Sequence, residues 1–596
     1  MNKKNIVRIS FTTLSILALA NCAQVTQPEL CDSNVTPIHA IQGQGFQSPL
    51  TGQQVTTRGI VTGNWQSEAE LGGFFLVSKP DDRDDNSLTS EGLFVQANEN
   101  LPRLQPGDWV YLTGTVAESN DLTQLTNLTH HAVCDSGYSV EPTVLNLPVT
   151  STEQFEALEG MPVHINQNLV VNGHYQLLRH GQIDVAHERL FTPTQHHRPG
   201  AEARAQAKSN ALARLVIDDN LTPNSDLPSS LKQTITASNT VRSGDTLAPL
   251  HGILSDFRGS YRLQPTSSVE ISQTNPRPVA PEAPAANTVR VAAFNVLNYF
   301  NGEGPNKQFP TDRGAKSTAD FARQHEKIIA ALSQLNADII GLLELENDGY
   351  TSHSAIAELT TALAEATGQP WRFVQAAPEK LGDDAITNGL IYRSDRVTPQ
   401  GEPLTLTTPP FGRLSRLPII QRFSPTNTVE NLVIAVNHFK SKGGCPKDSS
   451  NPNANQNDGQ ACWNEARTKS AELLAEFIDN HADLKRFPLR VLMGDFNAYA
   501  QEEPIQTFLQ YGYYNRIDAF NPHAYSYVYD AQAGSLDHLL VSSQLAARVV
   551  HQAIWSINAD EPTLLQYNNA DVNNNWYAPS PYRASDHDPI YADIQF

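Results

Sequence analysis

A proline-rich stretch at residues 275–287 divides the chain into two parts with different hydrophobic patterns. Its sequence, NPRPVAPEAPAAN, contains four prolines, which is typical of an extended, semi-rigid spacer. Before it, short β-branched segments such as residues 55–63 alternate with turn residues, a pattern that predicts strands. After it, apolar strands alternate with segments of helical spacing. The sequence therefore predicts a multidomain chain with a mainly β N-terminal half and an α/β C-terminal half.

We expect two β modules before the spacer, at residues 23–140 and 141–274. Residues 107–116 and 244–254 both begin with Gly-Asp and contain a second glycine, Gly114 or Gly252, within a strand pattern. Such a glycine is typical of a strongly bent strand, and small OB-like barrels have bends of this kind at their corners. Both modules are therefore predicted to be OB-like barrels. Two copies of a generic hairpin are the alternative.

Residues 1–22 have the pattern of an export signal. Lys3, Lys4 and Arg8 precede an apolar stretch at residues 11–20, which is too short to span a bilayer. The sequence LANC, which ends at Cys22, also resembles a bacterial lipoprotein box, although its Asn is unusual there. We expect an exported protein, extracellular or at the cell surface, and Cys22 could carry an outer-membrane lipid anchor. A buried N-terminal helix is the alternative.

The cysteine count is compatible with an oxidising compartment. The chain has five cysteines, so lipidation of Cys22 would leave an even number. We expect disulfides between Cys31 and Cys134 and between Cys445 and Cys462, with scrambled pairing across domains as the alternative. Cys445 and Cys462 bracket a polar insert and have no Cys or His partners at metal-ligand spacing.

Polar residues gather at the ends of the predicted strands after the spacer. A rigid sheet aims side chains at its strand ends, and active-site residues are expected there. Each of these residues alone could be a turn or cap residue, but their conjunction indicates a site. They are Asn295, Glu344, Asn437, His438, Asp495, Asn497, Asp537, His538, Asp586, His587 and Asp588.

These residue types are suited to hydrolysis of a phosphodiester. That reaction needs a hard cation on the phosphate oxygens, a base for water and donors for the developing charge. Carboxylate and amide oxygens are the ligands that Mg²⁺, Mn²⁺ and Ca²⁺ prefer. The sequence contains no zinc-type Cys/His spacing, no Gly-rich loop ending in Gly-Lys-Ser/Thr and no Gly-x-Ser-x-Gly elbow. We expect a divalent cation as cofactor, with Mg²⁺ first and Mn²⁺ or Ca²⁺ as alternatives.

The ordered set of motifs resembles the endonuclease/exonuclease/phosphatase superfamily, which includes deoxyribonuclease I. The resemblance covers residues 288–596 and implies a four-layer α/β sandwich. Together with residues 41–45, 55–63 and 72–76, the chain looks most similar to the bacterial extracellular nucleases of that superfamily. Leu343 departs from the pattern, since many members have Gln there. The matching pieces are FNV at 294–296, ADIIGLLE at 337–344, NHFKS at 437–441, GDFN at 494–497, LDHLL at 536–540 and SDHDP at 585–589.

The resemblance implies a metal site and a product. Glu344 would ligate the divalent ion, with Asn295 and Asp586 helping to set its site. The product would carry a 5′-phosphate and leave a free 3′-hydroxyl.

The resemblance also implies catalytic roles. His587, held by Asp537, would be the general base that deprotonates water. His438 would stabilise or protonate the leaving oxygen. Asp495 and Asn497 would position the phosphate and the nucleophile.

Charge constrains how a polyanion could bind. The net charge of -21 argues against a protein with a global basic field, and residues 288–596 hold 24 Lys and Arg against 35 Asp and Glu. Between residues 413 and 447, however, Glu430 is the only acid among several bases. Because this stretch passes through His438, we expect a phosphate-backbone track, with a solvated loop face as the alternative. Its predicted members are Arg413, Arg416, Arg422, Lys440 and Lys442.

The first hypothesis is therefore an exported, monomeric nuclease that degrades extracellular DNA, with RNA also open, and with little sequence specificity. A same-fold phosphodiesterase for phospholipid, or a phosphatase, is the second. The third is a non-catalytic adhesin. Tyr525 and Tyr527 could stack on bases or belong to the core. The acidic run at residues 81–86 is interpreted as a solvated loop.

Overall fold

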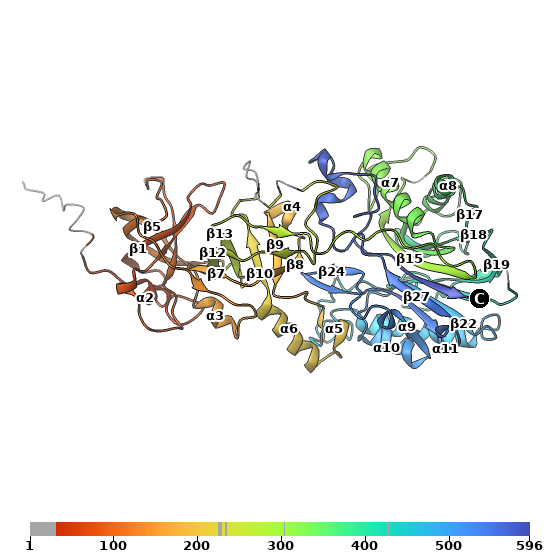
Figure 1. The fold of residues 1–596 in the computed structure, drawn as a ribbon. Coiled ribbons are helices and arrows are strands. Elements are labelled where there is room, and N and C mark those ends of the chain that lie inside the picture. Colours follow the sequence, from red (N-terminus) through yellow and green to blue (C-terminus); the bar gives the residue numbers. More distant parts are fainter. Residues whose placement is uncertain are drawn as a thin grey trace, which may run out of the picture.

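The computed structural model describes residues 31, 33–99, 101–223, 229, 231–232, 235–302, 304–426 and 428–596. The molecule is elongated, with a β-barrel at one end, a second β module in the middle and the α/β half at the other end (Figure 1). The predicted export segment, including Cys22, lies outside the described residues. Within the described residues, no helix is long and apolar enough to cross a membrane.

The first β module is a closed five-stranded barrel in the order β1-β2-β3-β5-β4. The register of β4 against β5 shifts between Thr113 and Thr115, and a Cβ on the intervening Gly114 would lie 2.7 Å from the carbonyl oxygen of Thr126. The predicted bend at Gly114 is therefore confirmed. The elements are α2 Ile38–Gln42, β1 Gln54–Trp65, β2 Gly73–Val77, η1 Pro80–Asp82, β3 Gly92–Gln96, β4 Trp109–Ser119 and β5 Leu122–Asp135.

Both predicted disulfides are present. Cys31 is bonded to Cys134 in the barrel, and Cys445 to Cys462 in the α/β half.

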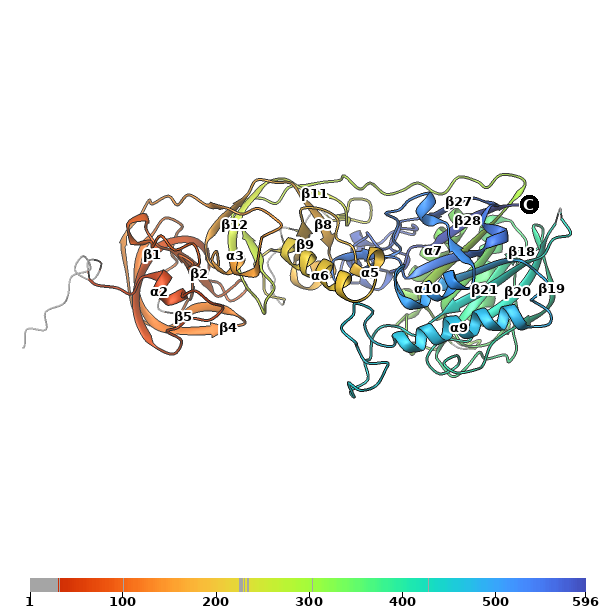
Figure 2. The ribbon, with the colours of Figure 1, turned by 90° about the horizontal axis from the view of Figure 1, so that it is seen from below.

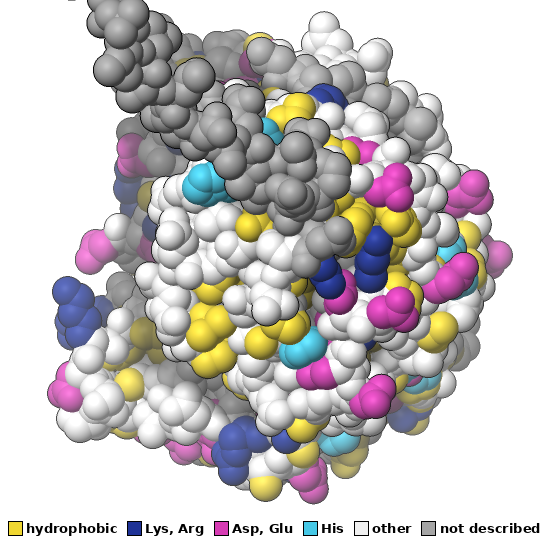
Figure 3. Space-filling view, turned by 90° about the vertical axis from the view of Figure 1, so that its left-hand side faces the viewer, with side chains coloured by type: hydrophobic (Ala, Val, Ile, Leu, Met, Phe, Trp, Pro, Cys, Tyr) yellow, Lys and Arg dark blue, Asp and Glu magenta, His cyan; other side chains and the backbone are white. Residues whose placement is uncertain are grey.

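On the barrel end of the molecule, the visible Lys and Arg side chains are scattered among Asp and Glu (Figure 3). This face therefore presents no gathered basic surface among its described residues.

The second β module is a single nine-stranded sheet in the order β14-β11-β8-β9-β10-β13-β12-β7-β6. Its outermost strands, β14 and β6, are two residues long and lie at opposite edges instead of pairing with each other. Short edge strands end a sheet, so the predicted second barrel is not confirmed. The elements are β6 Thr143–Val144, α3 Thr152–Glu156, β7 Pro162–Ile165, β8 Leu169–Gly173, α4 Leu177–His180, β9 Gln182–Ala186, α5 Pro193–His196, α6 Ala201–Ala213, β10 Leu215–Asp218, β11 Thr246–Leu247, β12 Leu250–Ser255, β13 Arg262–Pro265 and β14 Ile271–Ser272.

The proline-rich stretch forms no helix or strand, as the sequence predicts, but it is docked along its length. It runs over the surface from the second module to the start of β15 (Figure 2). The indole of Trp555 donates to the carbonyl of Val279 at 2.8 Å, and the hydroxyl of Tyr582 donates to the carbonyl of Pro278 at 3.0 Å. The stretch therefore lies against the α/β half as a strap.

The α/β half contains two six-stranded mixed sheets. The first has the order β17-β18-β16-β15-β28-β27 and the second the order β19-β20-β21-β22-β26-β23. β15 pairs in parallel with β16, and β21 in parallel with β22. All seven residues of β21 are buried, as expected for a strand covered on both faces.

The two sheets and their helices form four layers. Helix α9 lies on the outer face of the second sheet, and its buried residues belong to the same hydrophobic cluster as the residues between the two sheets. Helices α7 and α8 lie on the outer face of the first sheet and form a second hydrophobic cluster with it. The helices are α7 Thr318–Leu335, α8 Ala355–Thr367, α9 Asn464–Asn480, α10 Glu503–Gln510 and α11 Ser543–Ala546, with 3₁₀ turns η2 Ile517–Ala519, η3 Thr563–Leu565, η4 Tyr567–Asn569 and η5 Asn574–Trp576. The strands are β15 Thr288–Tyr299, β16 Ile339–Glu346, β17 Trp371–Phe373, β18 Ile386–Arg393, β19 Val397–Leu404, β20 Ile419–Pro425, β21 Leu432–His438, β22 Leu489–Asp495, β23 Tyr513–Asn515, β24 Tyr527–Tyr529, β25 Gln532–Gly534, β26 Asp537–Ser542, β27 Val549–Ile554 and β28 Ile590–Gln595.

Candidate active site

Three predicted site residues form a row across the second sheet. His438 at the end of β21 pairs with Asp495 at the end of β22, and Asp495 pairs with Asp537 at the start of β26. Residues directly opposite each other on neighbouring strands project from the same face of a sheet. The strand register therefore brings the two acids and the histidine together, and all three are buried.

The first sheet contributes Asn295 from β15 and Glu344 from β16. The amide of Asn295 donates to the Glu344 carboxylate at 3.2 Å and lies 3.4 Å from the carboxylate of Asp495 on the other sheet. The backbone N–H of Asn298 donates to the second carboxylate oxygen of Glu344 at 3.0 Å. These contacts join the ends of the two sheets into one site.

His587 completes this site from the loop before β28. Its Nδ1 lies 2.7 Å from the carboxylate of Asp537, which also accepts a hydrogen bond from the hydroxyl of Ser526 at 2.6 Å. Burial lowers the pKa of the imidazole, but Asp537 and the half-buried Asp586 outweigh this effect and bring it well above its usual value. His587 is therefore a strong proton acceptor in its neutral form.

His438 has the opposite electrostatic environment. Burial and the guanidinium of Arg416 hold its pKa well below the usual range. Its Nε2 lies 3.4 Å from the guanidinium of Arg416 and 3.5 Å from the carboxylate of Asp495. The two histidines thus differ in proton affinity, which is typical of sites that divide acid and base roles.

The backbone around the site is strained. Glu344 and Asn497 have positive φ angles of 66° and 49°. Gly494 has a φ of 128°, and a Cβ there would lie 2.1 Å from the carbonyl oxygen of Asn437. Residues held in such conformations gather at functional sites. The backbone N–H of Asn497 donates to Asp495 at 2.8 Å, which fixes the turn after β22.

Comparison with known proteins identifies this architecture. Residues 292–587 match the model of the Endonuclease/Exonuclease/phosphatase family. The C-terminal half of the chain belongs to this family. No curated protein matches the chain.

Several solved structures also match the chain. A humanized TDP2 from D. rerio is 15% identical, with a TM-score of 0.34, and the match covers 52% of this chain and 100% of that one. An endonuclease/exonuclease/phosphatase family protein from Bacteroides thetaiotaomicron is 16% identical over 52% of this chain and 97% of its own, with a TM-score of 0.34. The mannosyl-6-phosphatase Bt3783 from the same organism is 15% identical over 52% of this chain and 100% of its own, with a TM-score of 0.33.

The donor set of this endonuclease/exonuclease/phosphatase site fits a divalent cation. Asn295, Glu344 and Asp586 offer only oxygen ligands of the kind that Mg²⁺ prefers. Burial and the neighbouring Asp586 raise the pKa of Glu344, and they outweigh the opposite effect of His587 and Arg416. A second set of ligand atoms, from Asp495, Asp537 and His587, lies within 4.8 Å of one another. In that set, His587 and Asp537 already hydrogen-bond to each other.

The predicted basic track is only partly assembled. Arg416 lies beside His438, and the exposed Arg413 lies in the turn just before Arg416 in the sequence. Lys440 lies just after β21, before the insert, and donates to Ser441 and Gly443.

Two predicted members of that track are engaged in other contacts. Arg422 pairs with Val433, five residues from His438 along β21, and its guanidinium lies over the ring of Phe487. Lys442 is paired with the buried carboxylate of Glu502. Arg422 thus faces another part of the sheet, and Lys442 serves the fold.

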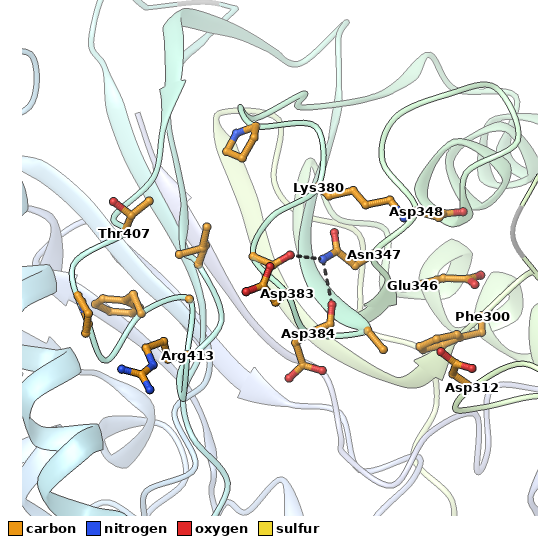
Figure 4. A pocket seen from close by; sticks show the side chains of 17 residues that line it. Phe300, Asp312, Glu346, Asn347, Asp348, Lys380, Asp383, Asp384, Thr407 and Arg413 are labelled. Atoms are coloured by element: carbon orange, nitrogen blue, oxygen red, sulfur yellow. Dashed lines mark hydrogen bonds between the residues drawn. The ribbon is translucent and has the colours of Figure 1, made fainter.

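A cavity of about 870 Å³ lies beside the site on the His438 side and is strongly acidic (Figure 4). One of its carboxylates, Asp384, forms an ion pair with Arg416 at 3.2 Å. The acids that line it are Asp312, Glu346, Asp348, Asp383 and Asp384. Two bases, Lys380 and Arg413, also line it, so acids outnumber bases in this cavity.

Sequence reasoning missed the residues that contact His587 and its partner Asp537. The ring of Tyr527 stacks on the imidazole with centroids 4.5 Å apart, and Ser526 orients Asp537. The hydroxyl of Ser585 donates to the carbonyl of Asn295 at 2.6 Å. The Tyr-Ser-Tyr alternation at residues 525–527 was the one available signal. It did not indicate that the β24–β25 hairpin would place these residues against His587.

Proposed function

We propose that the chain is an exported, divalent-cation-dependent nuclease that hydrolyses phosphodiester bonds of extracellular DNA with little sequence preference. The observation that carries this proposal is the meeting of two histidines, His438 and His587, whose pKa values shift in opposite directions, beside the half-buried carboxylate of Glu344. A base, a donor to a leaving oxygen and an anionic cation site are what phosphodiester hydrolysis needs.

In this proposal His587 takes the proton of the attacking water. Asp537 holds Nδ1, so the proton goes to Nε2, and the new bond forms between the water oxygen and phosphorus. The bond from phosphorus to the 3′-oxygen breaks, and His438 donates a hydrogen bond to that oxygen. The leaving oxygen takes a proton from solvent to become a hydroxyl, and His587 releases the proton that it has taken back to solvent. The products are a 5′-phosphate and a 3′-hydroxyl. A divalent cation bound at Glu344, Asn295 and Asp586 would offset the charge on the phosphate oxygens.

Two further observations favour exported DNA as the substrate. The two disulfides are typical of proteins that work in an oxidising compartment. The insert between Cys445 and Cys462 is polar and offers no apolar loop for a phospholipid surface, whereas Arg413 and Arg416 can contact phosphate. Because phosphate contacts carry no base information, we expect little sequence preference.

The test incubates the purified chain with supercoiled plasmid and, separately, with sphingomyelin, in buffers containing Mg²⁺, Mn²⁺, Ca²⁺ or EDTA. His587→Ala is compared with His130→Ala, a matched control at an exposed histidine of the barrel. We expect cation-dependent nicking that is lost in His587→Ala and retained in His130→Ala. Absence of DNA cleavage with every cation would overturn the proposal, and turnover of sphingomyelin would replace it with a phospholipid substrate.

A further inference from the structure

A second cavity, of about 500 Å³, opens between the second β module and the α/β half. The module contributes the loop after β8, which includes Tyr175, and the α/β half contributes the β24–β25 hairpin, which includes Tyr529. Asp586 and Tyr527 also line it. Because Tyr527 stacks on His587, this cavity begins at the proposed catalytic base.

The walls of this cavity are held together across the two halves of the chain. The backbone N–H of Ala533 donates to the carbonyl of Leu190 at 2.9 Å, and the N–H of Thr192 donates back to Ala533 at 2.8 Å. The side chain of Gln195 accepts from the N–H of Ser535 at 3.0 Å. The hairpin is thus fixed to the module by backbone hydrogen bonds, and the cavity is preformed.

Two aromatic rings in this cavity are unusually exposed. Tyr175 and Tyr529 are 75% and 65% exposed, although most aromatic side chains of the described residues are buried or half-buried. Exposed aromatic rings beside a nucleic-acid path serve as platforms on which bases stack. Their positions on opposite halves of the chain place one ring on each side of the junction.

The charges in the cavity favour a base over a phosphate. Arg214 is already paired with Asp184 and Asp530. The guanidinium of Arg583 donates to the backbone carbonyls of Asn558 and Glu561. Asp184, Asp530 and Asp586 also line the cavity, so its charged groups do not favour a phosphate, whereas its rings can accept a base. The two aromatic rings in the cavity on the His438 side, Phe300 and Phe411, are buried, so the bases of a bound strand are expected to lie on the exposed tyrosines instead.

We propose that this cavity is a nucleobase subsite in which Tyr175 and Tyr529 stack on the bases next to the scissile phosphate. The proposal rests on the proposed nuclease function and adds that the second β module forms part of the substrate site. Stacking requires unpaired bases, so the subsite selects a single-stranded or locally opened stretch. Any base can occupy it, because every base has a flat face.

The experiment compares Tyr175→Ala and Tyr529→Ala with Tyr514→Ala, a control at an exposed tyrosine of β23. Binding of a fluorescein-labelled single-stranded oligonucleotide is measured by anisotropy in EDTA, and steady-state cleavage is measured with Mg²⁺. We expect each cavity variant to weaken binding and raise KM about 5- to 100-fold, as loss of one stacked base does. Values of kcat, and hydrolysis of methyl 4-nitrophenyl phosphate, should stay unchanged. Tyr175→Phe and Tyr529→Phe should restore binding, because they keep the ring.

The outcomes separate the two proposals. Unchanged KM and binding in both alanine variants, in a chain that cleaves DNA, would overturn the subsite alone. An equal effect on duplex and single-stranded substrates would also overturn it. A wild-type chain that hydrolyses methyl 4-nitrophenyl phosphate but neither binds nor cleaves the oligonucleotide would overturn the nuclease function and the subsite with it.

Discussion

At the scale of single residues, the proposed chemistry depends on which charged groups surround each of the two histidines. Asp537 and Asp586 raise the pKa of His587 against the effect of burial, whereas burial and Arg416 lower that of His438. Buried charges interact more strongly than exposed ones, because they are less screened. Small changes in these partners should therefore have large effects on rate.

Replacing Asp537 with Asn tests this point. The change removes the negative charge that orients and supports His587, while the side chain keeps its size. We expect kcat for plasmid cleavage to fall by about 10²–10⁴-fold, the usual contribution of general base catalysis, with little change in KM. Asp571→Asn, at a side chain that is 74% exposed, is the control and should behave as wild type. Retention of kcat within a few-fold would contradict the assigned role.

Replacing Glu344 with Gln tests the cation site independently of activity. The change removes a half-buried negative charge but leaves an amide that can still contact Asn295. We expect the affinity for Mn²⁺, measured by calorimetry without nucleic acid, to fall at least about 10-fold, since even partners of metal ligands contribute that much. Glu365→Gln, at an exposed position of α8, is the matched control. Equal affinity in both variants would place the cation elsewhere.

At the scale of elements, the junction between the barrel and the nine-stranded sheet is built around a buried acid. Glu159 follows α3, and its carboxylate accepts hydrogen bonds from Gln42 at 3.2 Å and from the N–H of Thr123 at 3.1 Å. Beside it, a Cβ on Gly92 would lie 2.2 Å from the backbone of Gly160. The two modules therefore approach closely here, and Glu159 is fully buried.

This junction predicts a pH dependence of stability. Burial and the neighbouring Glu156 raise the pKa of Glu159 well above its ordinary value of 4.5, and burial raises the pKa of Glu156 itself to about 7. A group with a raised pKa in the folded state contributes stability that is complete below about pH 4.5 and is lost as pH rises through the folded pKa. We expect Glu159→Gln to raise the unfolding temperature at pH 8 and to change it little at pH 4.5.

Thermal unfolding between pH 4.5 and 8 checks this prediction. Glu153→Gln, at an exposed position of α3, is the control and should keep the wild-type dependence on pH. If Glu159→Gln instead lowers the unfolding temperature at pH 8, the charged carboxylate of Glu159 stabilises the fold and the prediction is wrong.

At the scale of the whole molecule, the second β module and the α/β half behave as one body. The core of the module includes Leu564 and Leu565 from the other half. Glu561 is fully buried and accepts from Arg242 of the module and from Arg277 of the proline-rich strap. A single carboxylate thus joins three segments that are far apart in the sequence.

Replacing Glu561 with Ala should destabilise the protein strongly. The change leaves Arg242, which is 3% exposed, without its main partner, and a buried charge that loses its partner typically destabilises by about 3–5 kcal/mol. Denaturant unfolding measures the effect. Asp395→Ala breaks an exposed pair with Arg393 and should cost at most about 1 kcal/mol. Equal small effects in the two variants would show that the two halves are coupled in another way.

Much of the candidate site follows from the sequence because its signals are local. Apolar strands that end in Asn295, Glu344, His438 and Asp495 can be recognised from periodicity, and the sheet edge on which these residues meet follows from parallel pairing of neighbouring strands. The separate pairing of the cysteines also follows, since the spacer keeps the two pairs in different parts of the chain.

Only the tertiary structure decided the rest, because contacts between distant segments leave no local pattern. The second module would close into a barrel only if β6 and β14 paired with each other. The sequences of these two strands do not indicate whether they meet. Ser526 and Tyr527 reach His587 only because the module at residues 190–195 holds their hairpin, and the register of β20 carries Arg422 away from His438. The strands and their polar ends were thus determined by the sequence alone, whereas packing between sheets and modules decided which side chains share the site.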